Sequence, residues 1–237
     1  MLNRLSRDRL HLVLMLALTF STGIADAVGY LGLDRVFTGN MTGNVVILGM
    51  GIAGADDLPV TGPLVALAAF MLGAAVAGRV LRGTAAGWSA RTTALLAAVA
   101  VAHALVALAL VLADPTAATS GPGETDSGYL RSVEVALAAG LALAMGAQAA
   151  AARHVAVKDV TTVVVTSTIT GLAADSWLGR GVGQPWARRA LAVLLIGAGA
   201  AAGALLLQLH LAWGVALSAL ITAVVAVLGH GSEDRPA

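Results

Sequence analysis

The sequence predicts an all-α, polytopic membrane protein. Of its 237 residues, 58% are hydrophobic and 11% are charged, and the mean hydropathy is +0.87. This balance departs from that of soluble domains and is typical of chains that cross a bilayer several times. Eight apolar segments follow one another along the chain: 10–33, 36–54, 63–81, 92–113, 135–152, 160–174, 186–207 and 212–228.

The same composition argues against several functions. Cysteine is absent, which excludes disulfides, thiol catalysis and thiolate metal sites. A formal net charge of +1 gives no reason to expect a nucleic-acid partner. His103, His154, His210 and His230 show no metal-ligand spacing, and no Ser-His-Asp set or P-loop is present. We therefore expect no metal, no cofactor and no enzymatic activity.

The first apolar segment, 10–33, follows a basic stretch that contains Arg4, Arg7 and Arg9. It continues to a length of roughly 20 residues, which is enough to span a bilayer. Because many apolar segments follow it, we do not interpret it as a cleaved signal peptide. We expect a first transmembrane helix behind a basic, cytoplasmic N-terminus.

Segments 36–54 and 160–174 are expected to enter the membrane and return on the same side. If all eight segments crossed, Arg79, Arg82 and Arg91 would lie outside. Such a placement opposes the bias of arginine and lysine toward cytoplasmic loops. Six crossings and two re-entrant segments therefore explain the charges better than eight crossings.

The six-crossing arrangement sorts the remaining loops by charge. The outside loops contain Asp56, Asp57 and the segment 114–130, which has no basic residue, and only Arg35 and Arg131 oppose the rule. The inside loops contain the N-terminus and most other basic residues, namely Arg79, Arg82, Arg91, Arg153, Lys158, Arg180, Arg188 and Arg189.

An internal duplication is indicated by the two re-entrant segments. Residues 36–43 and 164–171 share the pattern V-x-T-small-polar-x-T-G. Three spans in each half would invert the second copy, because an odd number of crossings reverses its direction. We expect a first repeat at 1–113, an acidic, polar extracytoplasmic linker at 114–130 and a second repeat at 131–237. Two further pairs align at nearly the same separation, 23–27 with 146–150 and 72–78 with 197–203.

Small residues recur four positions apart in two of the spans, as in the pairs Gly73 with Ala77 and Gly199 with Gly203. This spacing lets helix backbones approach closely. We expect a packing seam within the chain rather than a dimer interface.

The run T-G-N-M-T-G-N at 38–44 is the first candidate for a functional centre. Its amide and hydroxyl groups lie inside an apolar stretch, and irregular backbone at membrane depth usually lines a protein-covered or watery cavity. If both segments dip, two helix N-termini meet near the midplane and suit a neutral polar solute or a small anion. In the alternative, Asn40 and Thr168 only cap their helices. The candidate solute-binding residues are Thr38, Asn40, Thr42, Asn44, Thr166, Thr168 and Thr170.

Asp26 is the only carboxylate inside the eight apolar segments. An acid in a membrane span is costly, and the usual functional explanation is a proton or cation relay. Asp26 is therefore the candidate coupling residue. The structural alternative is a carboxylate that pairs with Arg35 or caps the re-entrant segment.

The residues G-I-A-D-A-V-G-Y-L at 23–31 and V-F-T-G-N-M-T-G-N-V-V-I-L-G at 36–49 resemble the signature of the YoaK family of bacterial integral membrane proteins. The family pattern tends to carry Gln-Asn in the second half, where this chain has Gln148 and Ala149. The resemblance implies a multi-pass protein of the bacterial inner membrane and assigns no biochemical activity.

The leading functional hypothesis is a transporter or channel for a small polar solute or anion. The alternative is a membrane scaffold or interaction protein whose polar motifs only brace the helices. The lipid bilayer is the one expected partner besides the solute, and the sequence leaves the solute and the oligomeric state open.

Overall fold

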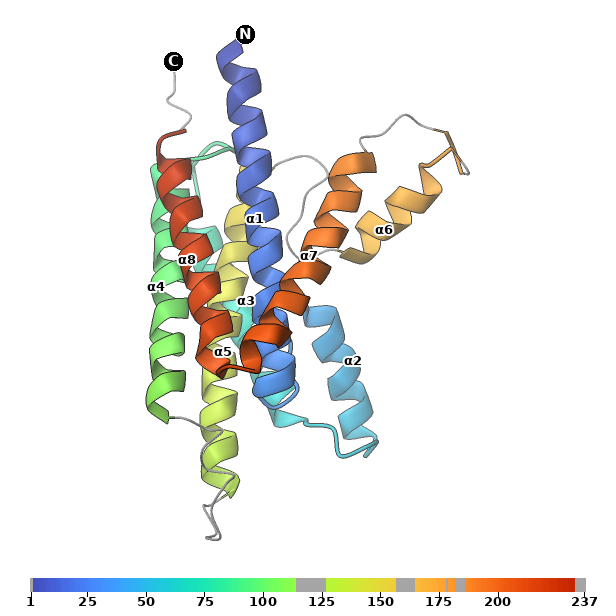
Figure 1. Cartoon of the computed structure of the whole chain (residues 1–237), viewed down its shortest axis with the longest axis vertical. Coiled ribbons are helices and arrows are strands. Elements are labelled where there is room, and N and C mark those ends of the chain that lie inside the picture. The colour runs from blue at the N-terminus through green and yellow to red at the C-terminus, as the bar shows by residue number, and fades with distance from the viewer. Residues whose placement is uncertain (1, 114–126, 157–164, 178, 182–185, 233–237) are drawn as a thin grey trace.

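The computed structural model describes residues 2–113, 127–156, 165–177, 179–181 and 186–232. Within these ranges the chain forms eight α-helices and no strand (Figure 1). They are α1 (Leu2–Gly32), α2 (Met41–Ile52), α3 (Thr61–Val80), α4 (Ala90–Ala113), α5 (Ser127–Val155), α6 (Val165–Ala174), α7 (Trp186–Leu207) and α8 (Leu211–His230).

Six of these helices are long and apolar enough to cross a membrane: α1, α3, α4, α5, α7 and α8. The other two, α2 and α6, have 12 and 10 residues. At about 1.5 Å per residue they reach roughly half of a hydrocarbon core of about 30 Å. The predicted number of spanning helices is therefore confirmed within the described part of the chain.

The long helices pack across the two predicted halves of the sequence. α1 lies against α7 and α8, α3 lies against α5, and α4 lies against α8 and α5. The largest buried cluster combines side chains from both halves, including Ile24, Leu110, Leu141 and Val215. The halves therefore form one bundle. Of the predicted linker, residues 114–126 lie outside the described residues, and its last four residues already belong to α5.

Four glycines let the helix backbones touch where α3 meets α5 and where α1 meets α7. A Cβ atom on any of the four would overlap backbone atoms of the facing helix, so only glycine fits without displacing that helix. The seam expected at Gly73 and Gly199 therefore lies within the chain, whereas a Cβ added to Gly78 or Gly197 would meet no facing atom within 4 Å. The four contacts are Gly73 with Leu143, Gly146 with Phe70, Gly23 with Ile196, and Gly199 with Phe20.

One end of the bundle gathers four separate parts of the chain. The His11 ring stacks on Trp88, in the loop between α3 and α4, at a centroid distance of 5.5 Å. His11 Nε2 also lies 3.0 Å from the Ser232 hydroxyl, after α8. The loop is tied to the end of α5, because Gly87 N–H donates to the His154 carbonyl at 3.2 Å. The N-terminus, this loop and the end of α5 were expected on one side of the membrane.

The connection from α1 to α3 begins and ends at the end of the bundle opposite to His11. Asp34, just after α1, and Gly62, in the first turn of α3, are so close that a Cβ on Gly62 would contact the Asp34 carboxylate. Between them the chain rises beside α1, and α2 then leads back to the start of α3 (Figure 1). The predicted segment 36–54 thus contains a non-helical rise to residue 40 followed by a short helix.

α5 ends and α7 begins at the N-terminal end of the bundle. Val155 at the end of α5 and Ala192 near the start of α7 belong to one buried cluster with Leu14. The short helix α6 lies on the connection between α5 and α7 and packs on α7. Residues 160–164 of the predicted second re-entrant segment lie outside the described residues.

Candidate functional site

The carboxylate of Asp26 holds the start of α2 inside the bundle. Its Oδ1 accepts the backbone N–H of Gly39 at 2.6 Å and that of Asn40 at 3.3 Å, and the Thr38 hydroxyl lies 3.5 Å away. Asp26 is only 8% exposed. Because six residues of helix separate Asp26 from Gly32, the start of α2 lies roughly 9 Å inside the end of α1. A negative charge at this position complements the partial positive charge of a helix N-terminus.

The reversal that brings residues 38–40 back to Asp26 depends on close contacts with the last turns of α1. The Gly29 carbonyl accepts the N–H of Leu33 at 3.1 Å and that of Val36 at 3.3 Å. A Cβ on Gly29 would overlap the Val36 carbonyl, so a larger residue would push the rising segment away. The Tyr30 and Phe37 rings stack at 4.8 Å across the same turn.

Asn44 clamps the rising segment from the first turns of α2. Its Oδ1 accepts the N–H of Phe37 at 2.9 Å, and its Nδ2 donates to the Phe37 carbonyl at 2.6 Å. Gly43 faces the Phe37 ring so closely that an added Cβ would overlap it. Asn44 is 1% exposed, so this candidate solute ligand has its polar groups turned into the fold.

The other first-half candidates divide into capping and exposed residues. Asn40 is the N-cap of α2, and its Oδ1 accepts the Gly43 N–H at 3.3 Å, as the structural alternative expected. Thr38 is buried beside Asp26. Asn40 and Thr42 are exposed at the surface of the protein. Of the four first-half candidates, these two can meet a solute without rearrangement.

The second-half candidates lie on α6. Thr166 and Thr170 are exposed, and the Thr170 hydroxyl donates to the Thr166 carbonyl at 2.9 Å. Thr168 lies three residues after the first residue of α6, so the alternative in which it caps the start of this helix is wrong. No residue of α6 is buried.

An ion pair after the end of α6 joins it to α7. Asp175 Oδ2 lies 2.9 Å from Arg189 Nη1, and Arg180 binds the other carboxylate oxygen. The hydrogen bond from Arg189, and to a smaller extent that from Arg180, holds the pKa of Asp175 below its ordinary value. Both Asp175 and Arg189 side chains are more than four-fifths covered, at 12% and 14% exposed.

The expected meeting of both candidate sets at the midplane is only partly supported by the geometry. α2 packs on α3 and α6 packs on α7, and no extensive contact joins α2 to α6 among the described residues. Figure 1 shows both short helices on the same side of the bundle, with the first turn of each toward the middle of its height. The two sets therefore share one side of the molecule but do not form a single closed cluster.

The Asp26–Arg35 ion pair, one form of the structural alternative for Asp26, does not form among the described residues. Arg35 is exposed, and the donors around Asp26 are backbone and hydroxyl groups instead. The neighbouring Asp34 takes the ion pair across the bundle: its Oδ1 lies 3.3 Å from Arg131 Nε at the start of α5. Burial raises the pKa of Asp34, and the Arg131 charge partly offsets that rise. The spanning part of α5 also contains Glu134, so Asp26 is not the sole carboxylate within the spanning helices.

A buried polar level at the centre of the bundle was not predicted. Gln148 of α5 is fully buried; its Nε2 donates to Thr22 Oγ1 of α1 at 3.3 Å, and its Oε1 lies 3.5 Å from Thr222 Oγ1 of α8. Next to it, Ser218 Oγ donates to the Ser21 carbonyl at 3.2 Å. Gln148 stands at the family position quoted above, but nothing in the sequence alone indicated that Thr22 and Thr222 face it.

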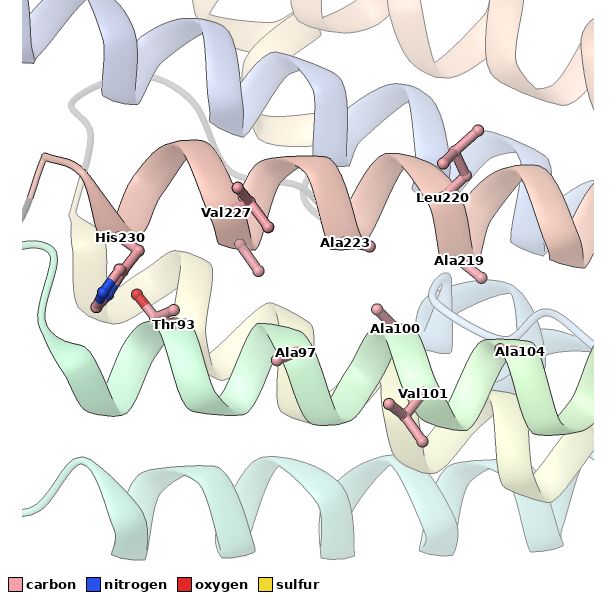
Figure 2. A pocket seen from close by; sticks show the side chains of 11 residues that line it. Thr93, Ala97, Ala100, Val101, Ala104, Ala219, Leu220, Ala223, Val227 and His230 are labelled. Carbon is pink, nitrogen blue, oxygen red and sulfur yellow. The ribbon is translucent and has the colours of Figure 1, made fainter.

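Cavities on the surface of the bundle include an apolar groove and a partly polar cavity. Figure 2 shows an apolar groove of about 650 Å³ between α4 and α8, lined mainly by alanine, with Thr93 and His230 at one end. A second cavity, of about 750 Å³, lies between the starts of α3 and α5, where Thr61, Arg131 and Ser132 supply polar atoms.

Comparisons with known proteins agree with the helical, membrane-spanning architecture. A family model described as "Protein of unknown function (DUF1275)" matches residues 14–228. The chain is 32% identical over 163 residues to "UPF0700 transmembrane protein YoaK" of Bacillus subtilis (strain 168), an alignment that covers 68% of this chain and 65% of that protein. The chain thus spans about two thirds of the length of that relative. No solved structure matches significantly. The chain is a multi-pass membrane protein and belongs to the DUF1275 family of proteins of unknown function.

Proposed function

We propose that this protein is a transporter or channel for a small polar solute, with a pathway along the side of the bundle that carries α2 and α6. The observation that carries this proposal is the start of α2, which Asp26 holds roughly 9 Å inside the end of α1. Polar groups are exposed at this depth instead of being enclosed by protein. The bilayer itself cannot hydrogen-bond with them.

Asn40 and Thr42 show why water is expected on this side. Both residues are exposed, and neither Asn40 Nδ2 nor the Thr42 hydroxyl has a hydrogen-bond partner among the described residues. Unpaired polar groups against hydrocarbon cost several kcal/mol each, roughly. A watery path past α2 removes that cost. The exposed Thr166 on α6 extends the same polar side toward the N-terminal end.

An inverted repeat is part of this proposal, and the glycine contacts support it. The contact of Gly23 with Ile196 corresponds to that of Gly146 with Phe70 when the halves are aligned, and that of Gly199 with Phe20 corresponds to that of Gly73 with Leu143. In each half a long helix, a short helix and two long helices follow in the same order. Inverted repeats with broken or short helices are a recurring design of secondary transporters.

The solute is more consistent with a neutral polar molecule than with an anion. The Asp26 carboxylate already occupies the N–H groups of Gly39 and Asn40, where an anion would bind. A second negative charge would be repelled there. Proton coupling through Asp26 remains part of the proposal, because the three donors converge on Oδ1 and none of them engages Oδ2.

The alternative, a scaffold without transport, is favoured by a specific observation as well. Most signature residues have a structural task in the reversal: Asp26 and Asn44 bind backbone, Gly29 permits close approach, and Asn40 caps α2. Such a turn would brace the bundle even without a solute. The two functions differ in whether water reaches α2.

Cysteine accessibility tests the proposal, because the chain has no native cysteine. We expect cysteine at Thr42 or Thr166 to react in membranes with a charged, water-soluble thiol reagent. Leu105 and Leu108 on α4, which are 61% and 54% exposed from the protein, are matched controls that should be covered by lipid and stay unreactive. Protection of the two threonine positions at the level of the leucine controls would favour the scaffold.

The orientation is also proposed, with the N-terminus in the cytoplasm of a bacterial cell. The end of the bundle that contains His11 and the loop before α4 carries most of the arginines, and the opposite end carries Asp34, Asp56 and Asp57. The bias of basic loops toward the cytoplasm supports this choice.

A further inference from the structure

The buried polar level around Gln148 has more acceptors than protons. The Thr22 hydroxyl donates to the Leu18 carbonyl at 2.9 Å, and the Thr222 hydroxyl donates to the Ser218 carbonyl at 2.8 Å. Each hydroxyl has a single proton. Thr22 can therefore accept from Gln148 Nε2, but Thr222, at 3.5 Å, has no second proton for Gln148 Oε1. The amide oxygen lacks a strong donor.

His103 of α4 adds a second acceptor that lacks a donor. The side chain is 0% exposed, and its Nδ1 lies 3.0 Å from the Val99 carbonyl. Because a carbonyl only accepts, Nδ1 carries the proton of the neutral ring and Nε2 presents a lone pair. Nε2 is buried and has no hydrogen-bond partner among the described residues. Buried acceptors are nearly always satisfied by protein or by ordered water.

α4 packs on both α8 and α5, the helices that carry Thr222 and Gln148. Figure 2 shows Ala100 and Ala104 of α4 along the same groove as Ala219 of α8. His103 lies between these two alanines in sequence but on the buried face, and Thr222 follows Ala219 by three residues on the buried face of α8. Thr222 is the neighbour of the Gln148 amide, so the turn of α4 that carries His103 lies beside the helix that contributes to this polar level.

We propose that this level is a binding site for a small hydrogen-bond donor, a single water molecule in the resting protein, which donates to His103 Nε2 and to Gln148 Oε1. A water molecule has two protons, which matches the two acceptors. Buried waters typically occupy such places, where several polar groups would otherwise be unpaired. The site joins α4, where His103 otherwise bonds only to the Val99 carbonyl of its own helix, to the polar groups of α1, α5 and α8.

Nuclear magnetic resonance on the whole protein in lipid nanodiscs tests this site directly. With ¹⁵N-labelled histidine, we expect His103 Nε2 to be unprotonated and to correlate with a water proton that disappears in D₂O. His103→Gln assigns the signal. His154, whose Nε2 lies 3.1 Å from the Thr84 hydroxyl, is the control for a bond to protein. A proton on His103 Nε2, a correlation with a protein donor only, or no water correlation while the control is visible would overturn the proposal.

Thermal melting of two variants gives an independent test. If water satisfies the ring, His103→Phe removes an acceptor from a paired network and lowers the melting temperature, whereas His103→Gln keeps an acceptor and lowers it less. If no donor is bound, His103→Phe removes an unpaired buried acceptor and relieves its desolvation cost. A melting temperature of His103→Phe at or above that of the unchanged protein would therefore refute the site.

Discussion

Removing the Asp26 carboxylate should loosen the start of α2 without dismantling the six long helices. Two backbone N–H groups, those of Gly39 and Asn40, lose their acceptor in Asp26→Ala. An unsatisfied buried N–H costs about 1–3 kcal/mol. The expected loss is therefore about 2–6 kcal/mol, with the lower end reached if water enters the turn.

Asp26→Asn separates the charge of the side chain from its shape. The amide oxygen can still accept, but bonds to a charged group contribute about 1.5–3 kcal/mol and neutral bonds about 0.5–1.5 kcal/mol. The expected loss is about 1 kcal/mol for each of the two N–H bonds, or about 2 kcal/mol in total. Asp26→Asn should thus fold and insert, and it is the variant with which pH-dependent flux can be examined once a substrate is known.

Arg35→Gln is the matched control. Arg35 is exposed and does not pair with Asp26 in the structure, so its replacement should change stability by no more than about 0.5 kcal/mol. Unfolding in mixed detergent micelles measures all three variants and the double variant, and the exchange rate of the Gly39 amide reports the turn itself. A large loss in Arg35→Gln that is not additive with Asp26→Asn, or an Asp26→Ala variant as stable as the original, would refute the reasoning.

Three further predictions concern packing, pH and topology. Gly73→Ala should destabilise the protein by about 1–3 kcal/mol because its methyl group overlaps the facing backbone. Gly78→Ala, whose methyl group lies in open space, should be neutral or stabilise the protein by up to about 1 kcal/mol. Equal effects of the two substitutions on the free energy of unfolding would contradict the glycine seam. The folded pKa of Asp175 lies below its ordinary value of 3.8. The ion pair with Arg189 therefore stabilises the attachment of α6 to α7 above pH 3.8 and is lost as the pH falls through the folded pKa. Hydrogen exchange in α6 should become faster in that pH range, and Asp175→Asn should remove this pH dependence. A topology reporter fused after Asp57 should report the outside and one in the loop between α3 and α4 the cytoplasm; a cytoplasmic signal after Asp57 would rule out the re-entrant connection.

The sequence alone determined the class of the protein and the number of its spans. Apolar runs long enough to cross a bilayer are local features, and the placement of arginines distinguishes crossing from returning segments because charges are costly to move across a membrane. The same local reasoning located the 38–44 run and proposed that Asn40 caps a helix, which the structure confirms.

Only the tertiary structure decided which polar groups meet. Asp34 is adjacent to Arg35 in sequence but pairs with Arg131, nearly a hundred residues away, because the end of α1 lies beside the start of α5. Asp26 binds the backbone of residues 39 and 40 because the chain reverses just after α1 and runs back close to Gly29. Gln148, Thr22 and Thr222 converge because α1, α5 and α8 share one core. In apolar helices so rich in alanine, many relative rotations bury similar areas, so the periodicity of the sequence does not specify the facing residues; the glycine contacts and the few buried polar groups fix them.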